Sequence, residues 1–205
     1  MSRRVHRVPY HLDDSGVRRL PPEEIAAVLR GADDLIMRGG RTLLAKVLKG
    51  SREKRVLELE LDRSPVYGRY REISTEEVLH RIDWVIRRGY LRIEYDYRLP
   101  LLVYTPAGWE IEKETYAREK IAQLDEMLAA GPPYPTATLK EMNKQVKLRM
   151  LDLLLERGDP AYLPVLHAWK RTDSHKMRPE IARAIRLLRG GDAGFTEEYD
   201  GSPPP

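Results

Sequence analysis

The sequence contains no cysteine. This absence excludes disulfide bonds, cysteine nucleophiles and every zinc or iron–sulfur site that cysteine would ligate. Five histidines are present, and none is spaced as in an H-E-x-x-H pair. We therefore expect neither a metal site nor a cofactor. The histidines are His6, His11, His80, His167 and His175.

Long apolar runs are also missing. No stretch of about 18 apolar residues occurs, so the sequence predicts no transmembrane helix and no membrane partner. The basic start, MSRRVHRVPYHLDD, lacks the apolar segment that follows the charges in a secretory signal. We expect a cytoplasmic protein.

Positive charge is unevenly distributed along the chain, whose net charge is +4. Residues 38–71 hold ten Lys or Arg against four Asp or Glu, and residues 136–189 hold twelve against six. Residues 72–130 between them hold eight against twelve. Two basic blocks favour a polyanionic partner, although a solvated, unevenly charged surface gives the same composition.

The first half of the chain predicts three helices and a hairpin after an extended arm, residues 1–20. Pro21-Pro22-Glu23-Glu24 opens a helix that runs to about Arg38, and a second helix ends at Gly50. Ser51 is expected to cap a third helix, over an alternating stretch that also fits a strand. The next capping box, Ser74 with Glu77, begins a helix that stops at Gly89.

Two predicted strands follow, from Tyr90 to about Tyr95 and from Leu101 to Thr105. Residues 106–108 are then expected to turn the chain. Helices followed by a two-stranded hairpin are the order of a winged helix, in which the hairpin is the wing. Trp84 falls opposite the apolar stripe of its helix and is expected to pack on a neighbouring element, with an open contact surface as the alternative.

The second half predicts helices only, so the fold class is mainly α with one small β-hairpin: a winged helix, then a helical region. Apolar periodicity indicates helices over residues 116–130, 137–157, 160–171 and 175–189, with Trp169 in the core. The predicted domains are 21–112 and 113–190. The tail 191–205 is rich in Gly, Pro and acidic residues and is expected to be disordered.

Residues 29–111 resemble the RQC domain, the winged helix that lies C-terminal to the motor of RecQ-type DNA helicases. Three segments in order carry this resemblance: Leu48-Lys49-Gly50-Ser51 with Lys54-Arg55, then Tyr67-Gly68, then Gly89-Tyr90-Leu91 with the hairpin and Thr105-Pro106-Ala107-Gly108. The whole chain is similar to a bacterial group of stand-alone RQC proteins, called RQC-minor. Residues 158–189 more weakly resemble one HEAT-type helix pair.

The resemblance implies DNA binding, whereas the family's helicase activity is not expected to transfer to this chain. No G-x-x-x-x-G-K-[ST] string is present to hold ATP, and no nucleophile–base pair is recognisable, so we expect no enzymatic activity. The resemblance also implies that an aromatic side chain near the wing tip stacks on the terminal base pair of a duplex. Here Tyr95 and Tyr97 are candidates, expected on one strand face, with Tyr97 nearer the tip. Alternatively, both tyrosines cover their own domain.

The residues expected to contact DNA lie at a helix N-terminus, a glycine turn and the wing. A helix N-terminus presents unpaired N–H groups to a phosphate, and the flanking cations add charge. The predicted set is Arg41, Lys49, Gly50, Ser51, Arg52, Lys54, Tyr67, Gly68, Arg69, Tyr95, Tyr97 and Arg98. Lys140, Lys144, Lys147, Arg178, Arg183 and Arg186 of the second half are expected to track phosphates or to dock a partner protein.

Three functions remain open from the sequence. The first is a non-enzymatic protein that recognises duplex or branched DNA in repair or replication and associates with the nucleoid. The second is an adaptor that recruits a helicase or another repair protein. The third is a winged-helix transcription regulator, although Glu76, Glu77 and Asp83 make residues 75–88 a poor reader of the major groove.

Overall fold

The computed structural model describes residues 7–190. They fall into two compact units that divide between Tyr116 and Ala117, inside a single helix, α5, Pro106–Ala130. The expected turn at residues 106–108 is therefore wrong. α5 instead begins at Pro106, directly after Thr105. Thr105 Oγ1 accepts a hydrogen bond from the Gly108 N–H at 3.1 Å, as a helix-capping side chain does, and the proline suits the first helical turn. The predicted tail lies outside the described residues.

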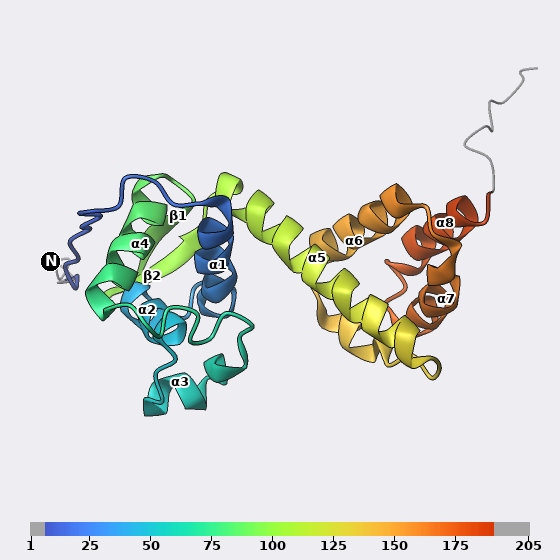
Figure 1. The fold of residues 1–205 in the computed structure, drawn as a ribbon, viewed down its shortest axis with the longest axis horizontal. Helices are drawn as coiled ribbons and strands as arrows, with labels where there is room; N and C mark the ends of the chain where they lie inside the picture. Colours follow the sequence, from blue (N-terminus) through green and yellow to red (C-terminus); the bar gives the residue numbers. More distant parts are fainter. Residues whose placement is uncertain (1–6, 191–205) are drawn as a thin grey trace, which may run out of the picture. The chain divides into compact units, whose positions relative to one another are not determined.

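The first unit is a winged helix (Figure 1). Its longer helices α1, α2 and α4 pack together, and the antiparallel hairpin of β1 and β2 lies against them. The elements are α1 Pro22–Ala32, a 3-10 turn Asp33–Leu35, α2 Arg41–Lys49, α3 Lys54–Glu58, a 3-10 turn Leu61–Arg63, α4 Thr75–Arg87, β1 Leu91–Asp96 and β2 Leu99–Tyr104.

The first helix ends earlier than its sequence predicts, at Ala32 instead of about Arg38. The residues after it are drawn into the sheet region: the Met37 N–H donates to the Leu102 carbonyl at 3.0 Å, and Leu102 N–H donates to the Gly39 carbonyl at 2.9 Å. These long-range bonds fix the hairpin against the helices. They require glycine at position 40, where a Cβ would lie 2.7 Å from a backbone oxygen of β2.

The prediction for the fourth helix is confirmed. Ser74 Oγ accepts from the Glu77 N–H at 3.1 Å, and the Glu77 carboxylate accepts from the Ser74 N–H at 2.9 Å. This capping box supplies partners to backbone groups that would otherwise face water. Its hydrogen bonds also hold the pKa of the Glu77 carboxyl below its ordinary value.

Residues 117–190 of the second unit form helices and no strand (Figure 1). Its first long helix begins at Lys144, not at residue 137, because residues 136–141 form a 3-10 turn and Asn143 caps the helix through its side chain. Trp169 is fully buried, as predicted. The elements after α5 are the 3-10 turn Thr136–Glu141, α6 Lys144–Arg157, a 3-10 turn Pro160–Tyr162, α7 Leu163–Thr172 and α8 Arg178–Leu188.

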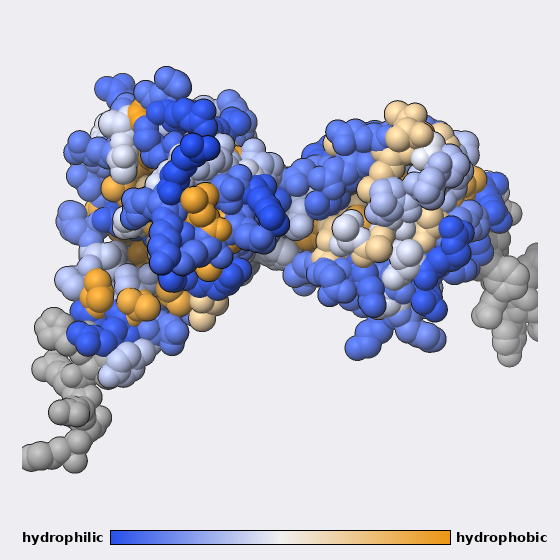
Figure 2. All heavy atoms as spheres, turned by 90° about the horizontal axis from the view of Figure 1, so that it is seen from below, coloured by the Kyte–Doolittle hydropathy of each residue, from blue (hydrophilic) through white to orange (hydrophobic). Residues whose placement is uncertain are grey.

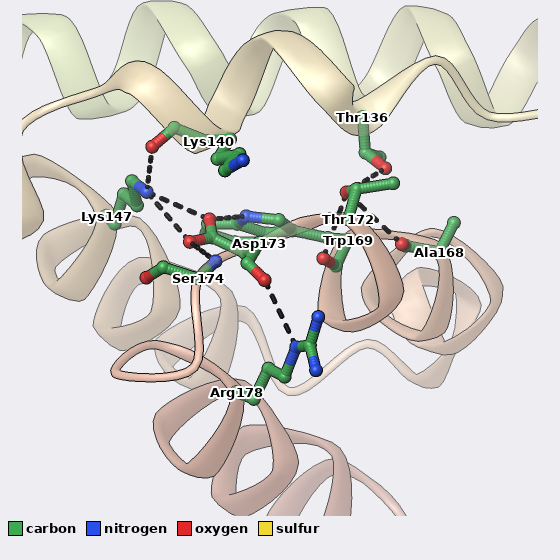
Figure 3. Close-up of polar contacts among 9 residues, drawn as sticks. All are labelled: Thr136, Lys140, Lys147, Ala168, Trp169, Thr172, Asp173, Ser174 and Arg178. Atoms are coloured by element: carbon green, nitrogen blue, oxygen red, sulfur yellow. Dashed lines mark hydrogen bonds and ion pairs between the residues drawn. The ribbon is translucent and has the colours of Figure 1, made fainter.

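A buried ion pair joins the helices of this unit (Figure 3). Lys147 Nζ donates to both carboxylate oxygens of Asp173, at 3.0 and 2.9 Å, and to the Lys140 carbonyl at 2.7 Å. The carboxylate also accepts from Trp169 Nε1 at 2.7 Å and from the Ser174 N–H at 2.6 Å. Lys147 therefore stabilises the core and does not track phosphates, contrary to the sequence prediction.

Candidate nucleic-acid interface

The wing ends in a two-residue turn, Tyr97–Arg98, between the paired residues Asp96 and Leu99. Tyr97 lies at φ +51°, in the left-handed region, and is 71% exposed. The strand alternation that places Tyr95 and Tyr97 on one face therefore does not apply, because Tyr97 is in the turn and outside β1. Leu99 and Pro100 belong to β2 and not to the tip.

Tyr95 contacts the protein's own N-terminal arm. Its hydroxyl donates to the Val8 carbonyl at 2.7 Å, and the Val8 N–H donates to the Arg98 carbonyl at 3.0 Å. The Arg7 guanidinium lies 4.8 Å from the centre of the Tyr95 ring, and the Tyr10 ring lies 6.0 Å from it. Of the two candidate tyrosines, Tyr95 is held by contacts with the N-terminal arm, and Tyr97 is exposed to solvent.

The predicted phosphate site at a helix N-terminus is not built as expected. Gly50 ends α2 at φ +72°, and Ser51 follows it without capping the next helix. That helix, α3, has five residues, and its N-cap residue is Glu53, which pairs with Lys46 at 2.6 Å. A carboxylate at the helix start disfavours a phosphate there, because like charges repel.

Two of the predicted cations are held inside the unit. Lys49 Nζ donates to the Arg71 carbonyl at 2.7 Å and also to the Ile73 carbonyl. Arg41 forms an ion pair with Asp83, whose side chain is almost fully buried. Sequence spacing placed both residues beside other cations, and only the tertiary contacts show that their charged groups are already satisfied.

The glycine turn at residues 66–71 packs on the end of α2. The Gly68 N–H donates to the Val47 carbonyl at 3.0 Å, and Tyr67 Oη donates to the Ser51 carbonyl at 3.0 Å. A Cβ on Gly50 would lie 3.0 Å from the Gly68 Cα, so the two glycines permit this approach. Tyr67 is thereby half-buried and positions the turn.

Exposed cations surround these two glycines. The Arg71 guanidinium lies against both of them, a placement that the sequence prediction missed. Arg52 and Arg69 are also exposed, and Lys54 is exposed but pairs with Glu58 at 3.6 Å. Within residues 7–190, neither Arg52 nor Arg71 has a carboxylate partner. We call Arg52, Arg69 and Arg71 the arginine cluster.

The sequence was also compared with known families and proteins. A profile of the RQC domain matches residues 22–124, which is half of the chain and covers the whole winged helix. The chain belongs to the RQC domain family. Searches of curated proteins and of solved structures each found no match. The RQC domain is the winged helix of RecQ-type proteins and binds nucleic acid, so the match assigns that general role to this unit.

In this RQC domain the arm covers part of α4, the helix that reads DNA in many winged helices. Asp83 Oδ2 accepts from the Asp13 N–H at 2.8 Å, and Arg87 pairs with Asp14 at 3.0 Å. Figure 1 shows the arm passing alongside α4. Trp84 of the same helix is buried, and its ring stacks on that of Tyr90 with 6.5 Å between the ring centres. The prediction that Trp84 packs on a neighbouring element is confirmed. The wing tip at Tyr97 and the arginine cluster remain exposed.

Outside the RQC domain, the remaining predicted cations of the second unit lie on its surface. Arg178 is partly engaged, since its Nε donates to the Asp173 carbonyl at 3.1 Å. The exposed members are Lys140, Lys144, Arg178, Arg183 and Arg186. Figure 2 shows a largely hydrophilic surface on the visible face of each unit.

Residues 7–190 contain neither a membrane-spanning helix nor a group of metal ligands. None of their helices is long and apolar enough to cross a membrane. Their His, Asp and Glu side chains form no group of three or more that could hold a metal ion.

Proposed function

We propose that this protein binds DNA without enzymatic activity and prefers duplex ends, forks or junctions over uniform duplex. The observation that carries this proposal is Tyr97, an aromatic ring 71% exposed at the tip of an RQC wing. A left-handed backbone costs a residue with a Cβ roughly 1–2 kcal/mol. Glycine or asparagine would avoid much of that cost, so a tyrosine here supports a role for its ring.

Stacking gives Tyr97 its expected effect. An aromatic platform contributes about 1–3 kcal/mol per base, and the stacking of one DNA step is about 1.4 kcal/mol. One tyrosine therefore compensates roughly one frayed step. The protein is expected to capture an end that opens by itself rather than to separate strands.

The arginine cluster supplies sequence-independent affinity. Each phosphate contact on duplex DNA adds about 0.9 to the slope of log affinity against log salt. Three arginines predict a contribution of roughly 2.7 to that slope. Binding that stays constant from low to high salt would exclude this backbone contact.

The decisive experiment compares Tyr97→Asn with Tyr97→Phe on a fork and on a blunt duplex of equal length. Asparagine tolerates the left-handed turn but offers no ring, whereas phenylalanine keeps the ring. We expect Tyr97→Asn to weaken fork binding about tenfold more than blunt-duplex binding, and Tyr97→Phe to behave as wild type. Equal losses on both substrates would show that Tyr97 does not recognise the junction.

The cellular setting belongs to the same proposal. Binding to branched DNA fits repair or replication at the nucleoid in the cytoplasm, beside a helicase or another repair protein. The HEAT-like resemblance of residues 158–189 and the similarity to stand-alone RQC-minor proteins support a second unit that contacts such a partner.

A further inference from the structure

A groove of about 480 Å³ lies beside the wing in the first unit. One wall is the arm, residues 8–11, and the other is the hairpin, with Ile93 and residues 99–101. The start of α2 and one residue of α3, Arg55, close the remaining sides. The volume falls within the range of about 300–1,000 Å³ that is typical of small-molecule sites.

The groove is positively charged. Its lining includes five basic side chains and no Asp or Glu: His11, Arg38, Arg41, Lys46 and Arg55. Arg41 and Lys46 already pair with carboxylates that lie outside the groove. For Arg38 and Arg55 the described part of the chain provides no carboxylate partner, so their charges are available to an anion.

The groove also exposes apolar and aromatic surface. Val8 is 44% exposed, Tyr10 41% and Leu99 58%, and all three line it. Contiguous exposed apolar side chains next to unpaired cations are the combination that binds single-stranded nucleic acid, in which bases stack and phosphates meet positive charge.

The groove begins where the wing tip ends. Leu99 follows the Tyr97–Arg98 turn directly, so its backbone lies at most about 7 Å from that of Tyr97, the reach of two residues of chain. A nucleotide released from a base pair at Tyr97 would therefore lie next to the groove entrance.

We propose that this groove binds the unpaired nucleotides next to a duplex end. Arg38 and Arg55 contact their phosphates, and Tyr10 with Leu99 contacts their bases. This inference rests on the proposed function and adds the single strand as a second element of the ligand. A fork is then recognised by two sites: the ring of Tyr97 at the last base pair, and the groove beyond it.

The test uses the full chain, one blunt duplex and the same duplex with a single-stranded extension of about six nucleotides, on the 5′ or the 3′ strand. The variant is Arg38→Gln with Arg55→Gln. The matched control is Arg18→Gln with Arg19→Gln, which removes the same charge from two exposed arginines of the same unit that do not line the groove.

We expect one of the two extensions to strengthen wild-type binding about tenfold over the blunt duplex, and the control to keep this gain. The groove variant should lose the gain while its blunt-duplex affinity changes less than about twofold. Two lost single-strand phosphate contacts should also lower its salt slope on the extended substrate by about 1.4 relative to the control.

Two results would overturn the inference. One is that neither extension strengthens wild-type binding. The other is that the groove variant keeps the gain, as it would if the groove served an acidic peptide. Tyr97→Asn in the same series tests the proposed function separately, because it removes the contact at the last base pair and leaves the lining of the groove intact.

A second measurement does not depend on any variant. Bromouracil placed in the effective extension should crosslink on irradiation to a peptide that contains residues 8–11 or 99–101, identified by mass spectrometry. Crosslinks confined to other parts of the chain would contradict the proposed path of the single strand.

Discussion

Replacing Asp173 by asparagine tests what holds the second unit together. The carboxylate is fully buried and accepts hydrogen bonds from Lys147, from Trp169 Nε1 and from the Ser174 N–H. Asparagine has nearly the same shape but carries no charge and has one acceptor oxygen in place of two. In the variant, the Lys147 ammonium keeps the Lys140 carbonyl as a partner and loses its counter-charge.

The expected loss follows from burial. Removing one member of a buried ion pair costs about 3–5 kcal/mol, because the other charge stays in a low-dielectric interior without compensation. The exposed fractions of the two side chains, 3% for Lys147 and 0% for Asp173, place this pair in that class. Since a domain of this size is stable by only about 5–15 kcal/mol, Asp173→Asn should bring the second unit close to unfolding at ordinary temperature.

Native-state hydrogen exchange measures this loss in the second unit alone, from the slowest amides of α6 and α7. Asp159→Asn is the matched control: Asp159 is exposed, and its side chain caps a turn, which asparagine also does. A further variant, Asp173→Asn with Lys147→Met, removes the stranded ammonium and should recover about 1–3 kcal/mol. The reasoning is refuted if Asp173→Asn costs no more than Asp159→Asn.

Three further predictions concern pH and packing. Burial alone would raise the pKa of Asp173, but its hydrogen bonds outweigh burial and hold the pKa below 3.8. The ionised carboxylate therefore stabilises the folded second unit fully above about pH 3.8, and acid titration should show this contribution to the free energy of unfolding being lost as the pH falls further. Asp173→Asn should lack this loss. Gly108→Ala places a Cβ 1.9 Å from a backbone carbonyl oxygen and should lower the melting temperature by an amount that corresponds to about 3 kcal/mol or more. Gly131→Ala, with no atom within 4 Å but φ +76°, should cost only about 1–2 kcal/mol. Burial and the neighbouring Arg189, which donates to its ring at 2.7 Å, lower the pKa of His167, so Arg189→Gln should raise that pKa toward 6.5 in an NMR titration. An unchanged titration would show that Arg189 does not influence the ring.

The sequence predicted correctly those helix and strand boundaries that are set by residues close to them in the chain. The capping box at Ser74 and the stop at Gly89 bound α4 as expected, because both act through hydrogen bonds and backbone angles within a few residues. The hairpin strands were placed to within about two residues for the same reason. The start of α5 carries a similar local signal, Thr105 followed by proline, although the proline and glycine of residues 106–108 also fit a turn.

Long-range contacts decided the rest of the candidate interface. Lys49 and Arg71 are 22 positions apart, and Tyr95 and Val8 are 87 apart. Nothing in the spacing of these residues shows that the side chain of Lys49 donates a hydrogen bond to the Arg71 carbonyl, or that of Tyr95 to the Val8 carbonyl. Cations and tyrosines that look equivalent in the sequence therefore differ in what they can offer to DNA.

The sequence by itself determined the mainly helical fold with one hairpin, because this follows from periodicity and caps. It also determined the family and the general role in nucleic-acid binding, because its motifs resemble those of the RQC domain and the profile of that family matches residues 22–124. Only the tertiary structure decided which groups remain available. Tyr95 contacts the N-terminal arm because the arm folds back over that part of the wing. Tyr97 is exposed because β1 ends at Asp96 and Tyr97 lies in the turn. Availability depends on what else the chain brings to the same place, and a linear sequence does not contain that information directly.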